Sequence, residues 1–180
     1  FERAIKGSGH VLGVFDFRDW LIPGRIRQRV PVLQSWDIRR INRNLIRQIR
    51  EFKPDLFIMN GGWTIFPETL SEIRNLSGTV MVNWPSDFPL KFDEYVRNAV
   101  YYDHFFTSGT DALRNYREAG NKNGHWLPFG CCPEIHKPVV LTEKEQKKYG
   151  CDICFVGSNY SERLDILEGL SEFDLGIWGI

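Results

Sequence analysis

The sequence predicts an α/β protein with a Rossmann-like, doubly wound parallel sheet, followed by the first strand, helix and strand of a second such domain. Two observations predict this. Short, continuous apolar runs alternate with segments whose apolar residues recur every three or four positions, which is typical of parallel strands joined by helices. After a charged stretch at 141–150 the same alternation starts again. The expected parts are an N-terminal domain at 1–140, a linker at 141–150 and a truncated domain at 151–180.

Each element of the first domain is expected from its local pattern. The apolar run 11–17 predicts a short strand. Ser35 is expected to cap a helix whose apolar face runs to Phe52 and which Lys53-Pro54 ends. Later helices are expected near Pro67, with Leu70, Ile73 and Leu76 on one face, and from Thr110 to Gly120. The remaining strands are expected at 55–62, 79–87, 103–109 and 125–130.

The second domain is expected to contain a strand at 152–157, a helix at about 160–171 and a strand at about 174–179. The stretch before it, "LTEKEQKKYG", has many charges and no apolar periodicity. It is compatible with a linker or with a solvated helical turn.

Charge is balanced over the chain but is concentrated in one part of it. The 180 residues contain 23 basic and 23 acidic side chains. Between residues 18 and 50, nine arginines face two aspartates, a local balance of +7. Arg39, Arg43, Arg47 and Arg50 fall on one helical face opposite the apolar one. A solvated face is the favoured interpretation, and an anionic acceptor or a membrane surface is the alternative. No nucleic-acid recognition motif accompanies the charge.

The sequence also indicates a compartment and argues against some chemistry. No apolar run is long enough to cross a bilayer and no signal peptide is recognisable, so we expect a cytoplasmic protein, with peripheral membrane association left open. The four cysteines, at 131, 132, 151 and 154, are interpreted as reduced thiols rather than zinc ligands, because residues 151 and 154 face opposite ways on a strand. We expect no metal. Neither a hydrolase triad nor a P-loop motif is present.

Candidate functional residues follow the predicted strands. In an open parallel sheet, ligands bind at the carboxyl ends of the strands, where the loops leave a crevice. Glycines or hydroxyl side chains follow five of the apolar runs. The candidates are Asn60, Gly61, Gly62, Asp87, Ser108, Gly130, Gly157, Ser158, Asn159 and Arg163.

The last of these turns, "FVGSNYSER", has several features that favour binding of an anion. Gly157 permits a close backbone approach, Ser158 offers a hydroxyl and Asn159 can cap the helix, whose free amides and dipole favour an anion. Arg163, one turn further, could contact a second phosphate oxygen. A plain strand-to-helix turn with a surface arginine explains the same residues equally well.

Asp87 is the candidate catalytic residue. It lies in "NWPSDFP", where two prolines stiffen the loop after a strand and fix the direction of the carboxylate. Such a carboxylate can take a proton from a sugar hydroxyl or simply bind hydroxyls. A cap on the following turn is an equal alternative. Asp16 is a weaker candidate.

Several segments together resemble the CgeB-like (spore maturation type) glycosyltransferases. They are "GSGHVLGVFDF", "KPDLFIMNGG", "VMVNWPSDFP", "YYDHFFTSGTDALRNYREAG", "HWLPFGCCPEIHKP" and "CDICFVGSNYSERLDIL", followed by "LGIWG". Their order and spacing carry the resemblance, which covers nearly the whole chain. The family is similar to GT-B glycosyltransferases, which have two Rossmann-like domains facing each other across a cleft. The resemblance implies that 151–180 is the start of the nucleotide-sugar-binding domain and that both ends of the sequence are truncated.

The resemblance also implies roles for the candidates. Gly157, Ser158 and Arg163 would lie near the donor phosphates, and Asp87 on the acceptor side. Helix amides and Arg163 would stabilise the leaving diphosphate in place of a metal ion. Ser86 departs from the family loop, which often has two acidic residues. The resemblance implies a nucleotide-sugar and an unknown acceptor as partners. The arginine-rich stretch leaves an anionic or membrane-associated acceptor open, and no nucleic acid is expected.

Two other functions remain open. A nucleotide-sugar epimerase has a similar architecture and a different reaction. A non-catalytic binding module could be built on one Rossmann-like domain, because this chain contains little of a donor domain. For the chain as given we expect weak binding of a nucleotide-sugar and no turnover.

Overall fold

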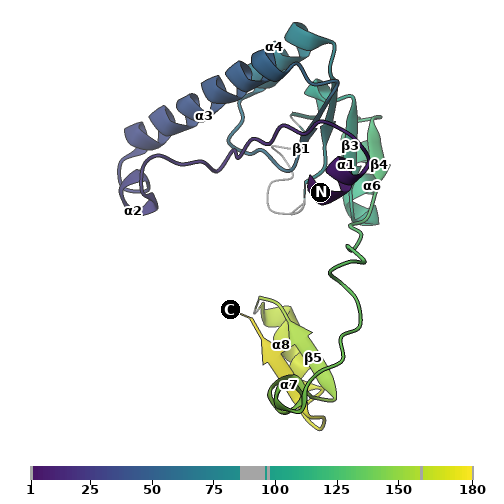
Figure 1. Ribbon diagram of the computed structural model, residues 1–180. Coiled ribbons are helices and arrows are strands. Elements are labelled where there is room, and N and C mark those ends of the chain that lie inside the picture. The colour runs from purple at the N-terminus through teal and green to yellow at the C-terminus, as the bar shows by residue number, and fades with distance from the viewer. Residues whose placement is uncertain (1, 86–95, 97, 159, 180) are drawn as a thin grey trace. The chain divides into compact units, whose positions relative to one another are not determined.

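A computed structural model describes residues 2–85, 96, 98–158 and 160–179. The chain divides into two compact units, Phe1–Gly130 and Cys131–Ile180. The elements in chain order are α1 (Glu2–Gly7), α2 (Gly24–Arg27), α3 (Pro31–Phe52), β1 (Leu56–Met59), α4 (Pro67–Ser77), β2 (Val80–Asn83), η2 (Ala99–Tyr101), β3 (His104–Thr107), α6 (Thr110–Glu118), β4 (Gly124–Trp126), α7 (Glu143–Tyr149), β5 (Ile153–Val156), α8 (Ser161–Glu168) and β6 (Leu175–Trp178) (Figure 1).

The first unit is an α/β structure built on a parallel sheet. Its four strands pair in the order β1-β2-β3-β4, and every pairing is parallel. Helix α4 connects β1 to β2 and helix α6 connects β3 to β4. This arrangement confirms the predicted α/β class with a parallel sheet and is compatible with a Rossmann-like fold. The strands at 55–62, 79–87, 103–109 and 125–130 are confirmed, although each is shorter than expected.

Helices α3, α4 and α6 pack on one face of the sheet. Met59 and Met81 join Ile41, Leu45 and Ile49 of α3 and Leu70 and Ile73 of α4 in one core, and Phe105 stacks on Tyr116 of α6. On the other face Leu56 and Val80 are 51% and 44% exposed, whereas Val82 is 8% exposed. Among the described residues, helices are thus found against one face only, and the predicted cover of the second face stays a prediction. Right-handed crossovers between strands that follow chain order place their helices on one face.

Helix α3 begins earlier than the sequence predicted. Ser35 was the expected cap, but Val30 is the N-cap and Pro31 is the first helical residue. Proline has its φ already fixed for a helix and lacks an N–H that would go unpaired there, so Pro31 is a good start. The helix ends at Phe52, where Lys53 adopts a left-handed conformation with φ 49°. The predicted end at Lys53-Pro54 is confirmed.

The apolar run 11–17 does not form the predicted strand. Its carbonyl groups bond to side chains instead: Gln48 Nε2 donates to Val14 O at 3.0 Å and Thr64 Oγ1 donates to Phe17 O at 3.3 Å. Phe15 and Phe17 pack against the core while Val14 is 56% exposed. The alternation of apolar residues thus reflects an extended segment with one buried side, and an apolar pattern alone does not supply a strand partner.

The second unit contains a parallel β-α-β. Strands β5 and β6 pair with each other from Ile153↔Leu175 to Val156↔Trp178, and α8 connects them. At their ends Gly157 N donates to Trp178 O at 2.9 Å, and a side chain at Gly179 would collide with the Gly157 carbonyl. No described residue of 131–180 is buried. That this β-α-β begins a nucleotide-sugar-binding domain stays a prediction.

The charged stretch 141–150 is a short helix, α7, within the second unit. Thr142 caps it with a capping box, in which Thr142 Oγ1 accepts from Glu145 N and Glu145 Oε2 accepts from Thr142 N. Hydrogen bonds from the Thr142 side chain and backbone lower the pKa of Glu145. Of the two interpretations of the sequence, a linker and a solvated helical turn, the second describes this structure.

Candidate functional site

The loop after β1 contains two buried glycines whose backbone conformation other residues rarely adopt. Gly61 and Gly62 have φ values of 83° and 81°, in the left-handed region that disfavours other residues. A Cβ atom at Gly62 would also lie 2.6 Å from Met59 Sδ. Asn60, just before them, is exposed. The predicted glycine loop is therefore a tight backbone turn at the carboxyl end of β1.

Asn42, on α3, holds the rest of this loop in place. Its side chain is buried, donates from Nδ2 to Thr64 O at 2.8 Å and accepts at Oδ1 from Phe66 N at 2.8 Å. A second bond runs from Nδ2 to Ile38 O of its own helix. Asn42 was not predicted from the sequence, although a polar residue between the apolar positions Ile41 and Leu45 was a signal that could have indicated it.

Asn83 connects the ends of β1 and β2 and leaves one polar atom without a partner. The residue is 1% exposed, and its Nδ2 donates to Gly61 O at 3.2 Å. Its Oδ1 is buried, and no donor bonds to it in the part of the chain that the structure describes. Buried polar groups are nearly always hydrogen-bonded, so an orphan acceptor in a glycine-lined strand end is a candidate ligand contact. Asn83 lies in a predicted strand, but the sequence did not predict a role for it.

Two tryptophans link the remaining strand ends. Trp84 Nε1 donates to Leu127 O at 3.1 Å, and its ring stacks on Phe129 at 5.1 Å between centroids. Trp126 Nε1 donates to Ser108 O at 3.0 Å. The loops after β2, β3 and β4 are thus joined to one another, and Asn83 joins β2 to the glycine loop. The structure brings Gly61, Gly62 and Ser108 to this edge, as predicted for carboxyl ends of parallel strands.

The remaining candidates of the first unit are Gly130, Asp87 and Asp16. Gly130 is exposed, and an added Cβ would meet nothing within 4 Å, so the position does not require glycine for lack of space. Asp87, the candidate base, lies outside the described residues, as does Ser86. Asp16, the weaker carboxylate, is exposed and accepts from the backbone N–H of Arg18 at 2.8 Å.

In the second unit, the turn after β5 is closed by Arg163. Its Nη1 donates to Ser158 O at 2.9 Å, and its guanidinium carbon lies 4.9 Å from the centroid of the Tyr160 ring. Gly157 is half-buried and Ser158 is exposed. The guanidinium thus lies beside the predicted Gly157-Ser158 turn and is bonded to it. Asn159 lies outside the described residues.

A histidine pair on the open face of the sheet was not predicted as a unit. His104 Nδ1 and His125 Nε2, on neighbouring strands β3 and β4, are 3.1 Å apart. Both side chains are exposed. Among the described residues, no group of three or more His, Cys, Asp or Glu side chains is placed to hold a metal ion. The four cysteines are free thiols.

Comparison with models of protein families gives no match, and comparison with curated proteins gives none either. The resemblance to CgeB-like glycosyltransferases therefore stays a prediction that depends on the quoted motifs alone. Within the described part of the chain, no helix has both the length and the apolar composition needed to cross a membrane.

Proposed function

We propose that this chain belongs to a metal-independent glycosyltransferase of GT-B architecture, which moves a sugar from a nucleotide-sugar donor to an acceptor hydroxyl. The observation that carries the proposal is the buried, unpaired Oδ1 of Asn83 at a glycine-lined strand end. Sugars and their acceptors are rich in hydroxyl donors, and such a donor would satisfy this atom. A hydroxyl ligand is therefore a better match than an anion, which has no proton to donate.

The other residues of the strand ends have complementary roles in this proposal. The positive-φ backbone at Gly61 and Gly62 would let a ligand approach the main chain closely. The stacked rings of Trp84 and Phe129 offer apolar area beside the polar atoms. Asp87 would accept the proton of the acceptor hydroxyl in an inverting reaction.

In the second unit, the proposed role of Gly157, Ser158, Asn159 and Arg163 is to bind the donor diphosphate. Backbone N–H groups and the guanidinium would stabilise the charge that develops on the leaving group. Arg163 would keep a bond to the Ser158 carbonyl or exchange it for a phosphate oxygen. Because no described side chain of this unit is buried, we expect these 180 residues to bind a donor weakly and not to turn it over.

The test is ligand-observed NMR with a panel of UDP- and GDP-sugars, the free diphosphates and the free sugars. We expect weak, saturable binding with a Kd of about 1 mM or above. Replacing Asn83 by Leu, which is similar in size, should weaken binding of the sugar about 2- to 12-fold, the value of one neutral hydrogen bond. Binding of the free diphosphates should be unchanged.

Asn42→Leu is the matched control, because it makes the same chemical change at a buried asparagine whose amide atoms are all bonded within the protein. It should lower the free energy of unfolding by about 2–4 kcal/mol, since it leaves Phe66 N and Thr64 O unpaired, yet leave the affinity of the folded molecules unchanged. Failure of every donor to bind, or equal affinities for wild type and Asn83→Leu, would refute the proposal. A change of sugar configuration without any acceptor would identify an epimerase instead.

A further inference from the structure

An apolar surface is exposed where the chain enters its longest helix. Helix α2 and the first turns of α3 extend past α4 and the sheet in Figure 1, and the buried residues of α3 begin only at Asp37. The large apolar side chains that are exposed here form what we call the apolar tip. They are Leu21 (63%), Ile26 (48%), Val30 (39%), Val32 (76%), Leu33 (36%) and Trp36 (46%).

Part of the apolar tip continues directly into a row of basic side chains. On α3, Val32 and Trp36 are followed by Arg39, Arg43 and Arg47 at spacings of three or four residues. Such spacing places all five on one helical face, opposite the face that contains the buried Ile41, Leu45 and Ile49. The row is about 22 Å long at 1.5 Å per residue. We call Arg39, Arg43 and Arg47 the arginine stripe.

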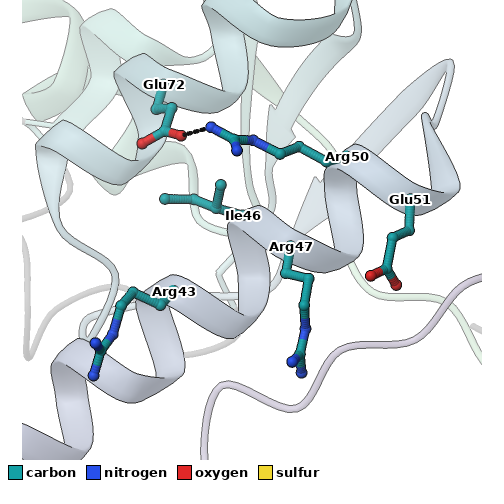
Figure 2. A pocket seen from close by; sticks show the side chains of 6 residues that line it. All are labelled: Arg43, Ile46, Arg47, Arg50, Glu51 and Glu72. Carbon is teal, nitrogen blue, oxygen red and sulfur yellow. Dashed lines mark hydrogen bonds and ion pairs between the residues drawn. The ribbon is translucent and has the colours of Figure 1, made fainter.

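The three side chains of the arginine stripe form no ion pair within the described part of the chain. Arg50, one turn further, points to α4 and bonds to Glu72 at 2.7 Å, whereas Arg43 and Arg47 point away from α4 (Figure 2). No ion pair is found there for any member of the stripe, and all three side chains are exposed. A shallow hollow beside the stripe is lined by Arg43, Ile46, Arg47, Arg50, Glu51 and Glu72.

The only two acidic residues between positions 18 and 50 are already paired with another arginine. Arg40 Nε donates to the buried Asp37 at 3.0 Å, and Arg40 Nη1 lies 3.4 Å from Asp19. The same Asp37 carboxylate accepts the backbone N–H groups of Leu21 and Ile22 at 3.0 Å. The tip is therefore tied to α3 by a buried carboxylate, and neither of these two acidic residues pairs with the stripe.

We propose that this surface docks the protein on an anionic lipid bilayer, with the apolar tip inserted among the acyl chains and the arginine stripe against the phosphates. An exposed apolar group next to a basic face, with tryptophan between them, has the composition of an interfacial membrane-binding element. Each arginine near an anionic surface strengthens binding by about 5-fold. The proposal does not depend on the glycosyltransferase assignment.

The alternatives fit the same surface less well. A nucleic acid would neutralise the arginine stripe, but its phosphates gain little from Val32, Leu21 or the other apolar side chains of the tip. A second copy of the chain would cover the apolar tip, but a symmetric contact through residues 18–50 would bring the arginine stripe no acidic group except the two already paired with Arg40. An anionic bilayer offers acyl chains to the apolar tip and phosphates to the arginine stripe, which is why we favour it.

The test is flotation of the 180-residue chain with vesicles of phosphatidylcholine, alone and mixed with phosphatidylglycerol. Wild type should bind the mixed vesicles more tightly than the neutral ones, and binding should weaken as salt screens the charge. Arg43→Ala combined with Arg47→Ala should lower the affinity about 30-fold. Val32→Asp should lower it at least tenfold, from the loss of apolar burial alone.

Matched controls separate these effects from general charge and hydrophobicity. Lys144→Ala combined with Lys147→Ala removes two exposed cations from α7, and Val140→Asp changes a valine that is 98% exposed. Both controls should bind vesicles as wild type does, and circular dichroism should show all variants folded. Quenching of tryptophan fluorescence by brominated lipid should be lower in Trp36→Phe than in wild type.

Several results would overturn the proposal. These are no binding to either vesicle, equal binding to neutral and anionic vesicles, or stripe and tip variants that bind like the controls. Tighter binding to a DNA duplex than to the anionic vesicles would indicate a nucleic-acid surface. Self-association without lipid that Val32→Asp abolishes would indicate a contact between copies.

Discussion

Asp37 shows how one buried carboxylate organises the entry to the long helix. Its side chain is fully buried and accepts hydrogen bonds from the N–H groups of Leu21 and Ile22 and from Arg40 Nε. Burial raises the pKa of Asp37, but the bonds from Ile22, Arg40 and Leu21, together with the charge of Arg40, outweigh it and lower the pKa. The ionised form is thus the one that the folded protein stabilises.

Replacing Asp37 by Asn should therefore destabilise the protein in a pH-dependent way. At neutral pH the variant should lose about 2–3 kcal/mol of unfolding free energy, the value of hydrogen bonds to a charged group. A carboxylate with a lowered folded pKa stabilises the protein above the unfolded pKa, about 4, and this contribution is lost as the pH falls through the folded pKa. The difference between wild type and variant should therefore shrink in acid.

Urea unfolding at a series of pH values measures this difference directly. Asp19→Asn is the control, because Asp19 is 71% exposed and its carboxylate lies 3.4 Å from the same Arg40. It should change the unfolding free energy by less than about 1 kcal/mol at any pH. A loss for Asp37→Asn that is equal at neutral and acidic pH would show that its charge does not matter.

At the scale of elements, two helices end in the same backbone conformation with different residues. Helix α3 ends at Lys53 with φ 49°, and helix α4 ends at Gly78 with φ 58°. The left-handed conformation costs a residue with a side chain about 1–2 kcal/mol and costs glycine little. An added Cβ at Gly78 would meet nothing within 4 Å, so the backbone conformation alone determines the effect of a substitution there.

Substitutions at Lys53 and Gly78 should change the free energy of unfolding in opposite directions. Lys53→Gly should raise the unfolding free energy by about 0.5–1 kcal/mol, after the greater freedom of glycine in the unfolded chain is subtracted. Gly78→Ala should lower it by about 1 kcal/mol. Thermal and urea unfolding of the two variants provide the measurement. If the unfolding free energy changes in the same direction in both variants, the left-handed backbone at the helix ends does not determine the effect of these substitutions.

These elements also show what the sequence could and could not predict. Continuous apolar runs were sufficient to predict β1 to β4, and periodic apolar residues were sufficient for α4 and α6, because burial of one helix face repeats along the chain. They were insufficient at 11–17, where the pattern is present but the backbone groups bond to Gln48 and Thr64. They also placed Leu76 on the packed face of α4, whereas it is 43% exposed at the last turn. A strand needs a neighbour and a helix face needs a partner, and a local pattern specifies neither.

The sequence predicted where the candidate site lies better than it predicted which residues form it. Glycines at strand ends indicated the loop at Gly61 and Gly62, because few other residues adopt positive φ. Asn42 and Asn83 were not assigned a role, because the bonding of a buried amide depends on loops from distant parts of the chain. The Trp84 and Trp126 bonds to neighbouring loops depend on sheet order in the same way.

At the scale of the whole molecule, the two units differ in how much apolar surface they bury. The first unit contains both core clusters, whereas the second unit has no buried residue among those described. A pair of strands with one helix is marginal on its own, because hydrogen bonds without a core contribute little net stability. The two sheets should therefore have different local stabilities within one chain.

Amide hydrogen exchange on the intact chain can measure this difference with a matched pair of amides. Phe105 N donates to Asn123 O and Gly157 N donates to Trp178 O, both at 2.9 Å, but Phe105 is fully buried and Gly157 is half-buried. Because the two bonds are equally long, a difference in protection reports on the core around them. Gly157 N–H should exchange roughly 100-fold faster or more, through local opening of the second unit. Equal protection of the two amides would mean that β5 and β6 open only when the first unit unfolds, and that burial within each unit does not determine its stability.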